Sequence, residues 1–249
     1  MQSEGFIHDI TKEYKEMYKV IVYKTPFDRM ALSNANKSKD KKKIKLKLNN
    51  SSESSIQRSV RRSRTAIADY TMCNDFDLFV TFTFNPKKVN RYDLGTTYLK
   101  MQGWLHRQQR KYPNFRYVCV PEKHKDGAIH FHALINGYEG NLRKTAVIQN
   151  ERLVYNVTGF TFGFTNAQYM DGDMKKATAY LCKYITKDMA MIHGRRRYWA
   201  SKNLRKPVKY VNEAYELNLM HRLDYSNVVH ETDFNVIYEV PKAVVGLFE

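Results

Sequence analysis

Cysteine, long apolar runs and acidic residues are all scarce in this chain of 249 residues. Its 3 cysteines include no Cys-x-x-Cys pair, which argues against a disulfide framework and against a thiolate zinc site. No apolar stretch approaches the roughly 18 residues that a membrane span needs. The N-terminus also lacks the basic and then apolar pattern of a secretory signal. We therefore expect a protein of a reducing intracellular compartment, with no membrane partner.

The shortage of acidic residues leaves a large positive charge. The chain has 42 Lys and Arg residues against 25 Asp and Glu residues, which gives a formal net charge of +17. Such a charge favours a polyanionic partner, and nucleic acid is the leading candidate. With 43% hydrophobic residues the chain is able to bury a substantial core, so one main domain with appendages is expected.

Composition divides the chain into four segments. Residues 1–34 form an N-terminal appendage, in which we expect a short helix and then a strand at Tyr18–Lys24. Residues 35–56 are rich in Asn, Ser and Lys and form a basic flexible linker, because they cannot bury enough apolar surface to offset chain entropy. The main domain follows at 57–210, and 211–249 form a C-terminal extension.

Helices and strands are mixed through the main domain. Aromatic and β-branched residues bounded by turn residues predict strands, and apolar residues at helical spacing predict helices. The expected strands are Asp77–Phe84, Arg116–Val120, Ala128–Asn136, Leu153–Val157 and Phe160–Thr165, and the expected helices are Ile56–Cys73, Leu94–Lys111 and Asp173–Met189. Beyond Tyr198 we expect a helical piece near Glu213–Met220 and a late strand near Asn235–Val240. The mixture indicates an α+β fold.

Two histidines on one expected strand point to a metal site. His130 and His132 are two residues apart, so a strand projects both imidazoles from one face. Glu122 precedes them across a hairpin-like connection, so antiparallel pairing could bring its carboxylate beside them. Two imidazole nitrogens and one carboxylate bind divalent cations and leave positions open for substrate oxygens. His124, in the connection, is a competing ligand.

The helix expected at Asp173–Met189 carries two overlapping Tyr-x-x-Lys units. Tyr180 and Tyr184 are four residues apart and share a helical face, and Lys183 and Lys187 each follow a tyrosine by three positions. A tyrosine hydroxyl becomes a usable nucleophile when a nearby cation favours the phenolate. The alternative is a pair of tyrosines that pack in the core while the lysines extend to water.

Taken together, these motifs resemble those of the HUH endonucleases, specifically the rolling-circle replication initiators. The motifs that carry the resemblance are Thr81-Phe82-Thr83-Phe84, then His130-Phe131-His132, then Tyr180-x-x-Lys183-Tyr184-x-x-Lys187, in that order. They span roughly residues 77 to 190. The paired tyrosines are similar to those of the two-tyrosine initiators of small phages, whereas the second unit alone resembles single-tyrosine initiators of viruses and plasmids.

The resemblance implies an RRM-like antiparallel sheet with the histidine strand in its centre, flanked by helices, within a nuclease domain at 57–210. It implies that Glu122, His130 and His132 hold Mg²⁺ or Mn²⁺, and that Tyr184 and Tyr180 are the nucleophiles. The expected reaction nicks single-stranded DNA at a replication origin and joins it again through a 5′-phosphotyrosine.

The family resemblance also implies partners and a location. The chain has no Gly-x-x-x-x-Gly-Lys-Ser/Thr phosphate loop, so it should depend on a host helicase as well as a host polymerase. The cytoplasm of a bacterial host is the expected location, with a nucleus as the second possibility. Of the two tyrosines, we favour Tyr184 for the first cut because its unit continues into Lys187-Asp188.

Further residues are candidates for DNA contact, and two other functions stay open. Thr81 and Thr83 lie on the exposed side of their strand, and Arg195, Arg196 and Arg197 follow the tyrosine helix closely. Trp199, beside the arginines, is a candidate for base stacking, whereas Trp104 is assigned to the core. The alternatives are a relaxase or single-strand transposase with the same chemistry, and a non-catalytic RRM-like protein with Phe79, Phe82 and Phe84 as platforms or core.

Overall fold

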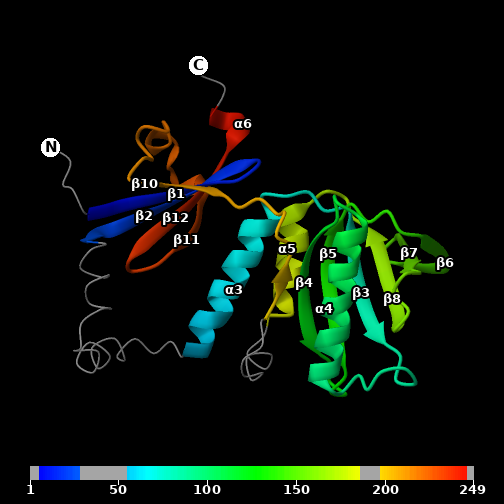
Figure 1. Cartoon of the computed structure of the whole chain (residues 1–249). Coiled ribbons are helices and arrows are strands. Elements are labelled where there is room, and N and C mark those ends of the chain that lie inside the picture. The colour runs from blue at the N-terminus through cyan, green and yellow to red at the C-terminus, as the bar shows by residue number, and fades with distance from the viewer. Residues whose placement is uncertain (1–5, 29–54, 186–196, 246–249) are drawn as a thin grey trace. The chain divides into compact units, whose positions relative to one another are not determined.

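The computed structural model describes residues 6–28, 55–185 and 197–245 (Figure 1). The chain forms two compact units, one made of Met1–Glu53 with Lys206–Glu249 and the other of Ser54–Arg205. The expected linker at 35–56 lies almost entirely outside the described residues. In the described ranges, no helix is both long and apolar enough to span a bilayer.

The unit Ser54–Arg205 is built on a seven-stranded sheet with the order β6-β7-β8-β3-β5-β4-β9. Every neighbouring pair is antiparallel. Its strands are β3 (Leu78–Phe84), β4 (Arg116–Lys123), β5 (Ile129–Asn136), β6 (Leu142–Gln149), β7 (Arg152–Val157), β8 (Gly163–Tyr169) and β9 (Trp199–Ala200). The α+β fold with an antiparallel sheet flanked by helices is therefore confirmed, and the histidine strand β5 lies inside the sheet.

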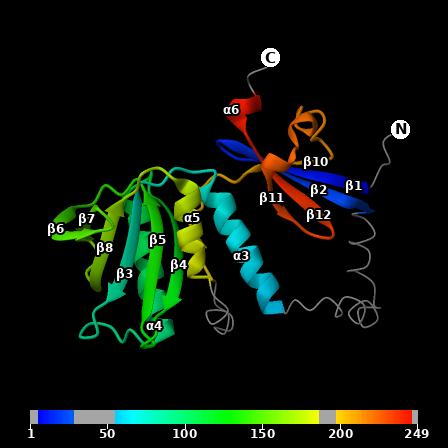
Figure 2. The same cartoon turned by 180° about the vertical axis from the view of Figure 1, so that it is seen from behind.

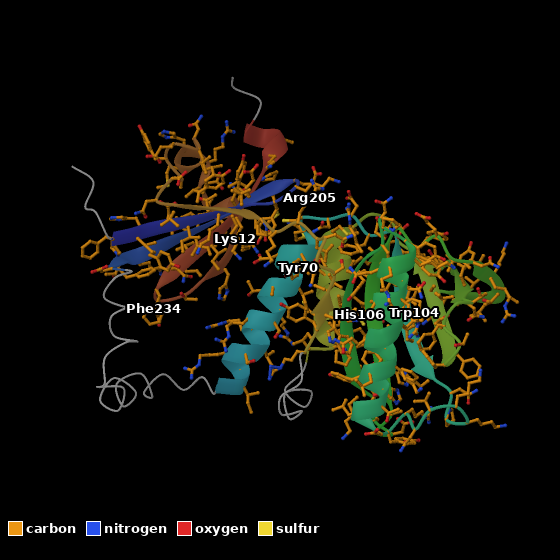
Figure 3. All side chains as sticks on the ribbon, viewed as in Figure 1. Lys12, Tyr70, Trp104, His106, Arg205 and Phe234 are labelled. Carbon is orange, nitrogen blue, oxygen red and sulfur yellow. The ribbon has the colours of Figure 1, made fainter. Side chains whose placement is uncertain are left out.

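Helices cover the two faces of this sheet separately. The helix α4 (Leu94–Lys111) lies on one face, as Figures 1 and 2 show, and its Trp104 packs against Phe82 and Phe160 (Figure 3). The helices α3 (Ser55–Thr71) and α5 (Met174–Lys183) pack on the opposite face, against a cluster that includes Val120 and Leu134. Because side chains alternate along a strand, each strand supplies one set of residues to each layer.

The main domain departs from the expected elements in two places. The sequence analysis missed β6, because most of its residues are exposed and no alternation of apolar and polar residues marks it. The strand expected at Phe160–Thr165 begins later, at Gly163, because Phe160 packs into the core ahead of the strand. Trp199, a candidate for base stacking, is 7% exposed and stacks on Phe131, so it is a core residue.

The other unit is a five-stranded antiparallel sheet that joins both ends of the chain, with the order β10-β1-β2-β12-β11. Its strands are β1 (Phe6–Glu13), β2 (Met17–Asp28), β10 (Val208–Val211), β11 (Val228–Glu231) and β12 (Asn235–Pro241), followed by the short helix α6 (Lys242–Val245). The predictions of strands at Tyr18–Lys24 and Asn235–Val240 are confirmed.

Two helix predictions in this unit are wrong. The expected N-terminal helix is the strand β1, whose buried side includes the polar residues Asp9 and Thr11, so no apolar period of two is visible in the sequence. This strand is stabilised by pairing with β10, which is distant along the chain. The helix expected near Glu213–Met220 is a series of turns, followed by a 3-10 turn at Met220–Arg222.

Candidate active site

The β4–β5 pair brings the three expected metal ligands to one face of the sheet. Glu122 lies directly opposite His130, and Val120 lies opposite His132. Since residues two apart share a face, Glu122 and both histidines project to the same side, which is the side covered by α5. His132 is buried at 4% exposure, whereas the Glu122 side chain is 30% exposed. The grouping expected from the sequence is therefore present.

Both ring nitrogens of His132 have hydrogen-bond partners. Its Nε2 lies 2.7 Å from Glu122 Oε2, and its Nδ1 lies 3.1 Å from Thr81 Oγ1. An ionised carboxylate only accepts, so Nε2–H donates to Glu122. In a neutral ring, Nδ1 then accepts from the Thr81 hydroxyl. The hydrogen bond from His132 lowers the pKa of Glu122 below its usual value, against the opposing effect of burial.

The second histidine has a different environment. The His130 ring stacks on the exposed His124 ring, with centroids 5.2 Å apart and planes 13° apart. Burial, with the nearby His124 and His132, lowers the pKa of His130, so the neutral form that binds metals is favoured. His124 Nδ1 lies 3.2 Å from Asp126 Oδ1. The competing ligand of the sequence analysis thus lies beside His130.

The donor set suits a hard divalent cation in chemistry but not yet in arrangement. Two imidazoles and a carboxylate are ligands that Mn²⁺ accepts. However, His132 Nε2 and Glu122 Oε2 point at each other, and across the described ranges no three His, Cys, Asp or Glu side chains are arranged to hold a metal ion. Binding of a cation requires the His132–Glu122 hydrogen bond to open and His130 to turn toward the carboxylate.

The tyrosine helix ends against the histidine strand. Asp173 caps the N-terminus of α5, as expected, by accepting from the backbone N–H of Lys176. Tyr180 lies in the last turns of the helix and Tyr184 at its C-cap. The Tyr184 ring stacks on the His132 ring, with centroids 3.6 Å apart and planes 8° apart. Two motifs that are distant along the chain are therefore in direct contact.

The two tyrosines differ in exposure and in electrostatics. Tyr180 is 44% exposed, and its ring packs edge-on against Phe79 and against Tyr184. Burial raises the pKa of Tyr184 well above its ordinary value, and a hydrogen bond with Tyr180 raises it further. A hydrogen bond that favours the neutral phenol is one that the phenol donates, so we infer that Tyr184 donates to Tyr180. The Lys183 ammonium lies 5.2 Å from the Tyr180 ring centroid.

Residues expected to contact DNA have mixed placements. Thr81 lies opposite His132, and Thr83 lies opposite His130. Thr81 is engaged with His132, so any DNA contact by its hydroxyl would compete with that bond. Arg197 donates from Nη1 to Ser59 Oγ at 2.7 Å. Lys187, Arg195 and Arg196 lie outside the described residues.

Replacing Thr81 with valine should lower stability, because it leaves a nitrogen of the buried His132 ring without its partner. A buried unsatisfied acceptor costs about 1–3 kcal/mol, whereas Thr83→Val, on the same strand face, should change stability by less than about 0.5 kcal/mol. Urea unfolding of both variants measures the difference. Equal effects of the two substitutions would mean that the Thr81–His132 bond contributes nothing specific.

The fold and the site together define an α+β protein whose sheet brings histidines, a carboxylate and tyrosines to one face. A comparison with protein families then narrows the class. Residues 77–189 match a family of the ORF2 type that is described as "Replication-associated protein", and the matched region contains all of these residues. The match supports a replication initiator family and an association with DNA replication. No curated protein and no solved structure matches the chain.

Proposed function

We propose that the protein is a rolling-circle replication initiator that nicks one DNA strand and rejoins it through a 5′-phosphotyrosine. The observation that carries the proposal is the stack of Tyr184 on His132, which is itself hydrogen-bonded to Glu122. Two candidate nucleophiles and a candidate set of metal ligands thus lie together, inside the region that matches the replication family. A purely structural role does not require this combination of residue types.

In this proposal Glu122, His130 and His132 hold Mg²⁺ or Mn²⁺. When bound, the cation would neutralise charge that develops on the scissile phosphate. A tyrosine oxygen forms a bond to phosphorus while the bond from phosphorus to the 3′ oxygen breaks. The proton lost by the tyrosine is balanced by the one that the leaving 3′ oxygen gains. The products are a free 3′-OH, able to prime synthesis, and a 5′-phosphotyrosine that preserves the bond for rejoining.

We further propose that Tyr180 makes the first cut and Tyr184 the second, the reverse of the order favoured from the sequence. Tyr180 is exposed, and donation from Tyr184 would stabilise its phenolate. Lys183, beside its ring, adds a cation. Tyr184, by contrast, is covered by its stack on His132. A second tyrosine one turn away lets the joined strand be cut again without dissociation.

The proposed substrate is single-stranded DNA at an origin. A net charge of +17 supports a polyanionic partner, and the absence of a phosphate loop supports dependence on a host helicase and polymerase. The cytoplasm of a bacterial host is the location that this function favours.

The polarity of the covalent product tests the proposal. Stem-loop oligonucleotides labelled at either end are incubated with the protein and Mn²⁺, then separated on a denaturing gel. The 3′ label should move with the protein, and the 5′-labelled fragment should carry a 3′-OH that a DNA polymerase extends. EDTA should prevent both results. Transfer of the 5′ label would contradict the mechanism, and binding without any adduct would favour a non-catalytic RRM-like protein.

A further inference from the structure

An exposed aromatic side chain lies on the same sheet face as the candidate active site. Phe164 of β8 is 63% exposed. It pairs with Thr83 of β3, and Thr83 pairs in turn with His130 of β5. Directly opposed residues in antiparallel strands share a face, so Phe164, Thr83 and His130 form a row across three strands. At the usual strand spacing, the row spans about 10 Å.

The position of Phe164 is fixed by the strand that carries it. A Cβ on the preceding residue, Gly163, would collide with the Thr83 carbonyl oxygen, so only glycine permits this close approach of β8 to β3. The register from Gly163 to Tyr169 is then continuous along β3. The Phe164 ring is therefore held beside Thr83 by backbone pairing, although its own face is largely open to solvent.

The surroundings of Phe164 are polar. Asn166 and Gln168 share its face of β8, and their side-chain amides bond to Gln149 at 2.7 and 3.4 Å. An apolar protein surface would need a contiguous apolar patch, and this row offers a single ring among amides and a hydroxyl. A nucleic-acid base has both an apolar face for the ring and polar edges for the amides.

We propose that Phe164 is a stacking platform for one base of the single-stranded DNA whose phosphate lies at His130 and His132. The proposal rests on the proposed function for the position of that phosphate. The platform holds the strand next to the reacting phosphate and gives little preference among bases, because every base presents a π-face. The positive charge of the protein supplies the attraction along the backbone of the strand.

Binding measured without chemistry tests the platform. Fluorescence anisotropy with a labelled single-stranded oligonucleotide, in EDTA, compares wild type with Phe164→Ala, Phe164→Tyr and Tyr169→Ala. Tyr169 is the matched control, because it is 51% exposed on the same strand but projects from the opposite face. Loss of one stacked base costs about 1–3 kcal/mol, or roughly 5- to 150-fold in affinity, and should appear in Phe164→Ala alone. The dependence on salt should stay unchanged, since no charge is removed.

A tryptophan at the same position gives a direct signal. Both native tryptophans are buried, at 1% and 7% exposure, so emission from Phe164→Trp reports the new side chain and should be quenched by the oligonucleotide. The platform is overturned if Phe164→Ala binds within about twofold of wild type, or if Tyr169→Ala loses as much affinity. Normal binding by Phe164→Ala with normal adduct formation rejects the platform alone. A loss of affinity in a protein that forms no adduct rejects the proposed chemistry and leaves Phe164 as a base contact.

Discussion

The double substitution Tyr180→Phe with Tyr184→Phe is expected to abolish the covalent DNA adduct while DNA binding persists. Phenylalanine keeps both rings, and so the packing of Tyr180 on Phe79 and of Tyr184 on His132, and removes only the oxygens that attack phosphorus. No adduct can form without a nucleophilic oxygen. An adduct that survives in the double variant would show that some other residue is the nucleophile.

The single variants separate the two tyrosines. Tyr180→Phe should slow the first adduct by about a hundredfold, because Tyr184 has to leave its stack on His132 and attack from a position displaced from the productive one. Tyr184→Phe should leave the first adduct near its wild-type rate and prevent the second cut. Burst kinetics on end-labelled DNA, with mass mapping of the modified peptide, measure both steps. The opposite pattern would restore Tyr184 as the first nucleophile.

Much of the candidate site is predictable from the sequence, because it depends on short periods. A spacing of two places His130 and His132 on one strand face, and a spacing of four brings Tyr180 near Tyr184. The position of Glu122 beside the histidines follows from a short hairpin-like connection, and the structure places it opposite His130. These features need only local geometry.

Other parts of the site depend on register between strands that are distant along the chain. The bond from Thr81 to His132 and the row from Phe164 to His130 both require the β3 register, which no sequence period specifies. Burial of Tyr184 is likewise a tertiary effect of α5 against β5. For this reason the sequence analysis assigned Thr81 only to DNA, did not single out Phe164, and favoured Tyr184 for the first cut.

The fold shows the same division between local and distant information. The strands β3, β4 and β5 were expected because runs of β-branched, aromatic and apolar residues end at turn signals. The strand β1 was not, because its partners include β10 from the far end of the chain and its buried side contains Asp9, whose pKa is raised by burial. Where polar residues are buried, a hydropathy pattern does not reveal the element.

The substitution Trp104→Ala should destabilise the protein by about 3–5 kcal/mol, the usual cost of removing a large buried aromatic side chain. Trp104 is 1% exposed, packs on Phe82 and Phe160, and donates from Nε1 to the Gly159 carbonyl at 3.0 Å. The control is Leu99→Ala on the same helix, where 65% exposure predicts a change below about 0.5 kcal/mol. Urea denaturation of both variants measures the difference. Because α4 and α5 cover opposite faces of the sheet, Trp104→Ala that is still folded should bind single-stranded DNA with wild-type affinity. A loss of affinity in the folded variant would mean that the α4 face also contributes to DNA binding.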